Sequence, residues 1–319
     1  MSNAGIETPP SSEVEALLRR DLAQGDRVLA GVAPVLRHLL TGSGQTLVSD
    51  DILARMRGML GDLAGQLLAS QAEASENDAD EFASMTDALA ERLAADTAVL
   101  GHCYAIAVEA QIATELEARS GVDQVLPPLM QELIASDETK SAELAMATMA
   151  AQARFLQAQR RMGLPLADLP AELFHDVLRS WSHFAKDSPA AERTKGEALL
   201  RAHYDESTSR IGLLGRLVSS LGSAAPAALR IEHAGFALFV TALAQLSGQP
   251  RELAILSCHP SQASRLAIGL RASGLKPEEV LEQFMTLHPE FALPQEFAGL
   301  GKDEARSLLD SSVLGEGAA

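Results

Sequence analysis

Hydrophobic residues recur at helical spacing along almost the whole chain, with polar residues in the positions between them. Within residues 137–162 one apolar stripe advances in steps of four, three, four and three: Ala142, Met146, Met149, Ala153 and Leu156. No run of β-branched residues alternates with polar ones between turn signals, which is the pattern of strands. The pattern predicts an all-α protein, a multi-helix bundle that runs into a short HEAT-like or solenoid-like helical stack.

Helix-start and helix-stop signals predict several boundaries. Ser136 can cap the helix of residues 137–162, and Gly163 suits its C-terminal end. We expect the apolar stripe of this helix to pack in the core rather than to form a Met-lined groove for a partner. A first helix follows Ser12, and we expect breaks in it near Gly25 and Pro34.

Another helix is predicted to begin after Ser49 and to contain three glycines. Gly58, Gly61 and Gly65 each cost up to about 1 kcal/mol relative to alanine in a helix interior. Close approach of a neighbouring helix would offset this cost, so we expect these glycines to face a packed neighbour.

Residues 172–186 form a clear amphipathic pattern. On a helix, one arc is apolar and contains Leu173, Phe174, Val177, Leu178, Ser180, Trp181 and Phe184. The opposite side carries Glu172, His175, Asp176, Arg179, His183 and Lys186. We interpret that side as a solvated polar face.

Composition shifts and turn signals divide the chain into five consecutive regions. They are a flexible tail over 1–10, an acidic helical region over 11–135, a central helical hairpin region over 136–222, a short-helix repeat unit over 225–290 and a mostly flexible tail over 291–319. Pro250, Pro260 and Pro277 each fit the first turn of a short helix in the repeat unit. The last region has room for one further helix.

Composition favours a cytosolic protein. Hydrophobic residues make up 47% of the chain, but aromatic residues only 4%, so the core must be built mainly from aliphatic side chains. We find no secretory signal, and the longest nearly uncharged stretch, 234–246, is shorter than the roughly 20 residues that cross a bilayer. Cys103 and Cys258 are far apart, and they do not imply a disulfide framework.

The formal net charge is −17, and most of it lies between Glu73 and Glu138, where 15 acidic residues face only Arg92 and Arg119. An acidic surface repels phosphate backbones and anionic lipids, so we expect neither nucleic-acid nor membrane binding. A basic protein partner is the contact that such a surface favours, although the charge also serves solubility. The candidate interaction surface consists of Asp78, Asp80, Glu81, Asp87 and Glu91.

Motifs of catalysis are absent from the sequence. The chain has no nucleophile elbow, no phosphate-binding glycine-rich loop ending in Lys-Ser or Lys-Thr, and no zinc-binding pair on a helix. Glu172 and His175 have the spacing of carboxylate-bridged di-metal bundles, but the second pair that such bundles need is missing. We therefore predict no catalytic residue, no cofactor and no metal site, and favour a non-enzymatic protein-interaction or regulatory role.

Two other functions stay open. Helices rich in Ala, Gly and Met can leave a cavity, which would make the protein a small-ligand-binding bundle. The segment His183 to Lys186 distantly resembles the phosphorylatable helix of histidine phosphotransfer domains, so His183 is a candidate phosphoacceptor. Partner identity and oligomeric state do not follow from the sequence.

Two segments carry a resemblance to a known family. "FLQAQRRMGLPLADLPAELFHDVL" (155–178) and the stretch 233–280, which ends near "LRASGL", resemble an uncharacterised alphaproteobacterial family of helical, repeat-like proteins, a domain of unknown function. The similarity covers roughly a third of the chain. It implies an all-helical, HEAT-like fold and no particular activity.

Overall fold

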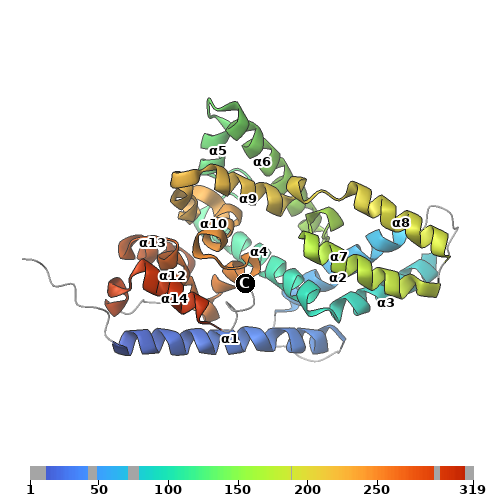
Figure 1. Ribbon diagram of the computed structural model, residues 1–319, viewed down its shortest axis with the longest axis horizontal. Coiled ribbons are helices and arrows are strands. Elements are labelled where there is room, and N and C mark those ends of the chain that lie inside the picture. The colour runs from blue at the N-terminus through green and yellow to red at the C-terminus, as the bar shows by residue number, and fades with distance from the viewer. Residues whose placement is uncertain (1–11, 42–48, 71–78, 188, 291–294, 313–319) are drawn as a thin grey trace, which may run out of the picture. The chain divides into compact units, whose positions relative to one another are not determined.

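The computed structural model describes residues 12–41, 49–70, 79–187, 189–290 and 295–312 (Figure 1). Within these residues the chain forms fourteen α-helices and six short 3-10 helices, and it forms no strand. The all-α, multi-helix prediction is confirmed. The tail predicted over residues 1–10 lies outside the described residues.

The chain divides into two compact units, and both combine segments that are far apart in the sequence. The first unit takes its residues from 1–31, 112–132 and 218–319, and the second from 32–111 and 133–217. The regions expected from composition are consecutive stretches, whereas these units interleave along the chain.

The second unit is built around two neighbouring helices, α2 (Asp50–Ala69) and α3 (Ala79–Ala94), which pack along each other. Its core contains fully buried side chains from both helices: Met56, Leu63, Leu67, Leu89 and Leu93. The further α-helices with residues in this unit are α1 (Ser12–Thr41), from residue 32 onward, α4 (Thr97–Ser120), α5 (Pro128–Ile134), α6 (Thr139–Arg160), α7 (Ala171–Phe184), α8 (Ala190–His203) and α9 (Arg210–Ser220). As predicted, α2 begins directly after Ser49, although the Ser49 side chain makes no capping hydrogen bond.

The three glycines of α2 have different surroundings. A Cβ added at Gly58 would collide with the Cβ of Met162, so this glycine allows the close approach that the sequence predicted. No described residue lies within 4 Å of a Cβ placed at Gly61 or Gly65, and for these two the prediction of a packed neighbour was wrong. The sequence gives the spacing of the three glycines but not the position of the neighbouring segment, and Met162 lies close to Gly58 alone.

The buried face of α6 differs from the predicted stripe. Met146 is 47% exposed, whereas Thr148, Gln152 and Phe155 are buried. The expectation that the methionine stripe packs in the core was therefore wrong at Met146, because the fold supplies hydrogen-bond partners to polar side chains on the adjacent face. The helix ends at Arg160, and the residue after it with the left-handed conformation is Met162 (φ 57°), not Gly163.

The amphipathic prediction for residues 172–186 is confirmed by α7. Phe174, Val177 and Trp181 are buried, and His175 and His183 are exposed. The ring of Phe174 stacks on that of Tyr204, with their centres 3.9 Å apart. The apolar side of α7 thus faces the core of its unit, and its histidines face outward.

The first unit contains a series of short helices after the 3-10 helix η4 (Gly222–Leu229). They are α10 (Ile231–Ser247), α11 (Arg251–Ser257), the 3-10 helix η5 (Pro260–Gln262), α12 (Ala263–Ala272) and α13 (Pro277–Leu287). Within α10 the backbone kinks at Gly235, which adopts a φ of 72°. A Cβ at Gly235 would lie 2.9 Å from Pro127, so both the conformation and the space require glycine there.

The first helix, α1 (Ser12–Thr41), runs without interruption through Gly25 and Pro34. The predicted breaks at both residues were wrong. Gly25 is instead a contact point, because the side-chain amide of Gln262 lies where a Cβ would be and its Nε2 donates to the Gly25 carbonyl at 3.0 Å. Pro34 removes one backbone donor, and the helix continues past it.

The end of the chain is more structured than predicted. Residues 295–312 form the 3-10 helix η6 (Gln295–Gly299) and the helix α14 (Lys302–Asp310), which packs on α12 (Figure 1). Leu300, Ala305 and Leu308 are buried. The prediction of a mostly flexible tail is therefore corrected for residues 295–312. The one helix that was expected there, α14, has an apolar face that packs on α12.

Candidate functional site

Four of the five predicted interaction residues lie on α3, and Asp78 lies outside the described residues. Asp80 and Glu81 occupy its first turn, Asp87 and Glu91 follow one turn apart, and all four are exposed. Because a helix turns by about 100° per residue, Asp80, Asp87 and Glu91 share one face, and Glu81 lies about 100° away from it.

Two of these carboxylates line a cleft of about 270 Å³ between α2 and α3. Its lining residues are Arg57, Leu60, Gly61, Asp87, Ala90, Glu91 and Ala94. The open space beside Gly61 contributes to this hollow. In the part of the chain that the structure describes, the carboxylates of Asp87 and Glu91 make no hydrogen bond or ion pair, so they can accept hydrogen bonds from a bound group.

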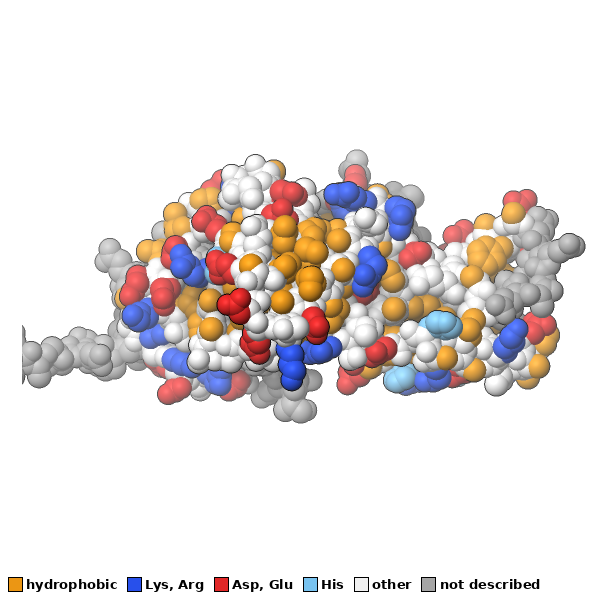
Figure 2. Space-filling model, turned by 90° about the horizontal axis from the view of Figure 1, so that it is seen from above, with side chains coloured by type: hydrophobic (Ala, Val, Ile, Leu, Met, Phe, Trp, Pro, Cys, Tyr) orange, Lys and Arg blue, Asp and Glu red, His pale blue; other side chains and the backbone are white. Residues whose placement is uncertain are grey.

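Several of the remaining acidic residues between 73 and 138 have structural partners within their own unit. Glu109 is buried in an ion pair, Glu132 pairs with His233 at 3.0 Å, and Asp96 accepts a hydrogen bond from the first turn of α4. The face drawn in Figure 2 shows acidic, basic and hydrophobic side chains interspersed. The α3 face is thus the part of the acidic region with a defined geometry.

A buried polar cluster centres on Arg210 at the start of α9. Its guanidinium forms an ion pair with Glu109 of α4, and its Nε donates to Oε1 of Gln152 at 2.6 Å. The guanidinium carbon also lies 3.9 Å from the ring centre of Phe155, a cation–π contact. These contacts compensate for the burial of the two charges.

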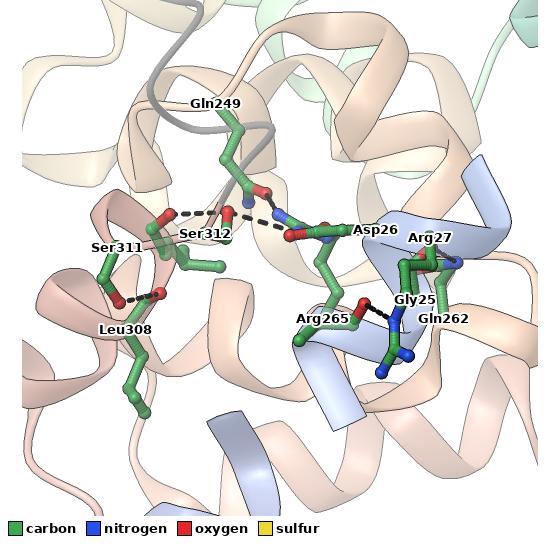
Figure 3. A network of polar contacts seen from close by, with 11 residues as sticks. Gly25, Asp26, Arg27, Gln249, Gln262, Arg265, Leu308, Ser311 and Ser312 are labelled. Carbon is green, nitrogen blue, oxygen red and sulfur yellow. Dashed lines mark hydrogen bonds and ion pairs between the residues drawn. The ribbon is translucent and has the colours of Figure 1, made fainter. Parts of the chain in front are cut away.

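A second buried cluster, drawn in Figure 3, centres on Arg265 of α12. Its guanidinium forms an ion pair with Asp26 of α1 and donates to Oε1 of Gln249 at 3.1 Å and to Oγ of Ser312 at 3.3 Å. Burial lowers the pKa of Arg265, and the negative charge of Asp26 opposes that shift. The cluster joins the first and last described segments of its unit.

Neither buried arginine offers acid–base chemistry. Arginine stays protonated in proteins, and each carboxylate is held by the guanidinium opposite it. We assign both clusters a structural role. Neither cluster was predicted from the sequence, although Arg265 interrupts an otherwise uncharged helical stretch over 263–270, and a lone charge of this kind is a signal of a buried ion pair.

The candidate phosphoacceptor His183 is exposed at the end of α7. Its Nδ1 lies 3.0 Å from the carbonyl oxygen of Arg179. This leaves Nε2 as the nitrogen that could take a phosphoryl group. The phosphoacceptor role stays a prediction that rests on the sequence resemblance.

Glu172 and His175, the pair with di-metal spacing, lie on the outer side of α7. The Nδ1 of His175 is 3.2 Å from a guanidinium nitrogen of Arg201 on α8, and a cation at that distance disfavours a metal ion. Across the described ranges, no three side chains of His, Cys, Asp or Glu gather in a way that could hold a metal ion.

Both cysteines are buried as free thiols. Burial raises the pKa of the Cys103 thiol to about 12, a shift that a backbone hydrogen bond partly opposes. Because the thiolate is the reactive form, Cys103 is a poor nucleophile at neutral pH.

Among the described helices, none by itself is long and apolar enough to cross a bilayer. One pair, η4 and α10, meets the criterion only when the two are joined, and they are bent by 111° relative to each other.

The chain was also compared with known proteins. No family model, no curated protein and no solved structure matches it.

Proposed function

We propose that this protein is a non-enzymatic helical interaction module that binds a basic protein partner through the acidic face of α3. One observation carries the proposal. Asp87 and Glu91 stand one turn apart, are exposed, have no internal partner among the described residues and border a cleft whose other lining residues include Leu60, Gly61, Ala90 and Ala94.

The cleft matches the chemistry of a lysine or arginine side chain. Such a side chain has an apolar stem, which would lie over Gly61, Ala90 and Ala94, and a cationic end, which would reach Asp87 and Glu91. A charge-assisted hydrogen bond from a cation to a carboxylate is among the stronger ones in proteins. Arg57 reduces the net charge of the cleft, so we expect close contacts more than long-range attraction to give the affinity.

Neutralising the face tests the proposal. The variant carries Asp80→Asn, Asp87→Asn and Glu91→Gln, and its matched control carries Glu278→Gln, Glu290→Gln and Asp303→Asn, three exposed carboxylates of the other unit. Wild type and both variants are used to capture proteins from lysate, which are identified by quantitative mass spectrometry. A captured basic protein that binds wild type and the control but not the α3 variant supports the proposal, and binding of the purified pair is then measured by calorimetry.

An identical set of captured proteins for all three baits would contradict the assignment of this face.

We further propose that the protein is cytoplasmic. Because of its negative net charge, we expect neither nucleic acid nor membrane among its partners. The short helices of residues 225–290 are proposed as a HEAT-like repeat, in line with the family resemblance, which brings no activity with it.

A further inference from the structure

A polar pocket of about 300 Å³ lies in the first unit. It is lined by the start of α5, the first turn of α10 and one side of α13: Pro128, Arg230, Glu232, His233, Glu282, Gln283 and Thr286. Segments from two separate parts of the chain therefore build one polar hollow. Its size is at the lower end of the range for small-molecule sites.

Gln283 is the buried polar group of this pocket. Its side chain is only 4% exposed, and its Oε1 accepts a hydrogen bond from the backbone N–H of Ile231 at 2.9 Å. The backbone group is a donor, so the oxygen of the carboxamide must face it and the NH2 group must point elsewhere. In the described chain this NH2 group has no acceptor. A ligand oxygen in the pocket can accept a hydrogen bond from this NH2 group.

Three charged side chains around Gln283 also lack internal partners. Arg230, Glu232 and Glu282 form no side-chain hydrogen bond or ion pair with any other described residue. His233 lies beside them, and its Nε2 is 3.0 Å from a carboxylate oxygen of Glu132. The pocket therefore presents one cation and two carboxylates to whatever enters it.

This combination excludes ligands of a single charge. A simple anion would face the carboxylates of Glu232 and Glu282, and a simple cation would face the guanidinium of Arg230 and the NH2 group of Gln283. A molecule with both charges satisfies all four groups. Arginine binds carboxylates in a planar, two-bond arrangement, and carboxylates bind ammonium groups.

We propose that this pocket binds a small zwitterion of the size of a free α-amino acid. The ligand carboxylate faces Arg230 and the NH2 group of Gln283, and its ammonium group faces Glu232 and Glu282. The proposal is independent of the α3 interaction surface, because the two lie in different units and share no residue.

Binding of amino acids to the full chain tests the proposal. The twenty standard L-amino acids are added singly, at about 10 mM, and binding is followed by ligand-detected NMR and thermal shift. Each amino acid that binds is compared with the amine that lacks its carboxylate and the acid that lacks its ammonium group. We expect both to bind about tenfold or more weakly, because each loses a charge-assisted contact.

Two variants test the residues, each with a matched control. Gln283→Glu keeps the acceptor for Ile231 but replaces the NH2 donor by an oxygen, and Arg230→Met removes the cation. Both are expected to weaken binding about tenfold or more. Arg20→Met and Glu278→Gln, which change exposed charges of the same unit outside the pocket, should leave the affinity unchanged. Circular dichroism confirms that each variant is folded.

Three results would overturn the proposal. The first is that no amino acid binds at this concentration. The second is that the amine or the acid binds as well as the amino acid, which would indicate a site for a single charge. The third is that folded Arg230→Met binds as wild type does, which would place the ligand elsewhere. Unchanged capture of protein partners by the pocket variants is expected, so the test is separate from that of the α3 face.

Discussion

Asp26 on α1 and Arg265 on α12 form a buried ion pair although 239 positions separate them in the sequence (Figure 3). Gln262 adds a hydrogen bond to the backbone of Gly25 one position away from Asp26. A buried charge without its partner is strongly unfavourable, so this pair ties α1 to the short helices near the end of the chain.

Removing the carboxylate of this pair should destabilise the fold. We expect Asp26→Ala to lower the free energy of unfolding by about 3–5 kcal/mol, because the Arg265 guanidinium stays buried without its counter-charge. Urea unfolding followed by circular dichroism measures the change. Arg20→Ala, an exposed position on the same helix, should cost less than about 0.5 kcal/mol. Equal losses for the two variants would show that the pair has no special role.

The Glu109–Arg210 pair allows a double-mutant test. Glu109→Leu alone leaves a buried guanidinium and should cost about 3–5 kcal/mol, whereas the double variant with Arg210→Met removes both charges. We therefore expect the double variant to be more stable than Glu109→Leu, with a coupling of about 1–3 kcal/mol in urea unfolding. The free-energy losses of the single variants Glu109→Leu and Arg210→Met are measured as well. If these two losses add up to the loss of the double variant, the side chains do not interact in the folded state.

The glycines of α2 should respond to alanine in opposite directions. Gly58→Ala introduces a methyl group against Met162 and should destabilise the protein by about 1–3 kcal/mol. Gly65→Ala meets open space and should stabilise it by about 0.5–1 kcal/mol, since alanine loses less backbone entropy in a helix. The two melting temperatures should move apart. A gain at Gly58 would mean that Met162 moves aside easily.

Acid should destabilise the first unit through His288. Burial, together with the positive charges of His259 and Arg119, lowers the pKa of this histidine from 6.5 to about 4. Between about pH 6.5 and 4 the histidine is therefore protonated in the unfolded state but not in the folded state. The free energy of unfolding decreases as the pH falls through this range. Measuring the free energy of unfolding at several pH values across this range gives its slope against pH. We expect this slope to be shallower in His288→Gln. An unchanged slope would assign the acid sensitivity to other groups.

Local sequence was sufficient for part of this fold. The start of α2 after Ser49, the amphipathic α7 and the helix starts at Pro260 and Pro277 follow from backbone hydrogen bonding and from the 3.6-residue period, whereas Pro250 lies directly before α11 and not in its first turn. These depend on residues within a few positions of one another. For the same reason, the exposure of the carboxylates on α3 could be predicted from the charge pattern.

Tertiary contacts decided the rest. Gln262 decided the role of Gly25, which contacts this side chain and does not break the helix. Arg210 decided which side chain of α6 is buried, because it supplies a hydrogen-bond partner to Gln152, whereas Met146 is exposed. The pocket around Gln283 likewise required α5, α10 and α13 to meet. A polar side chain can be buried only where a partner is present, and the partners here come from segments separated by tens to hundreds of positions. The sequence by itself therefore determined the helices and some of their ends, and the tertiary structure decided which faces are buried and where the polar groups meet, because helix formation is local and the compensation of buried polar groups is not.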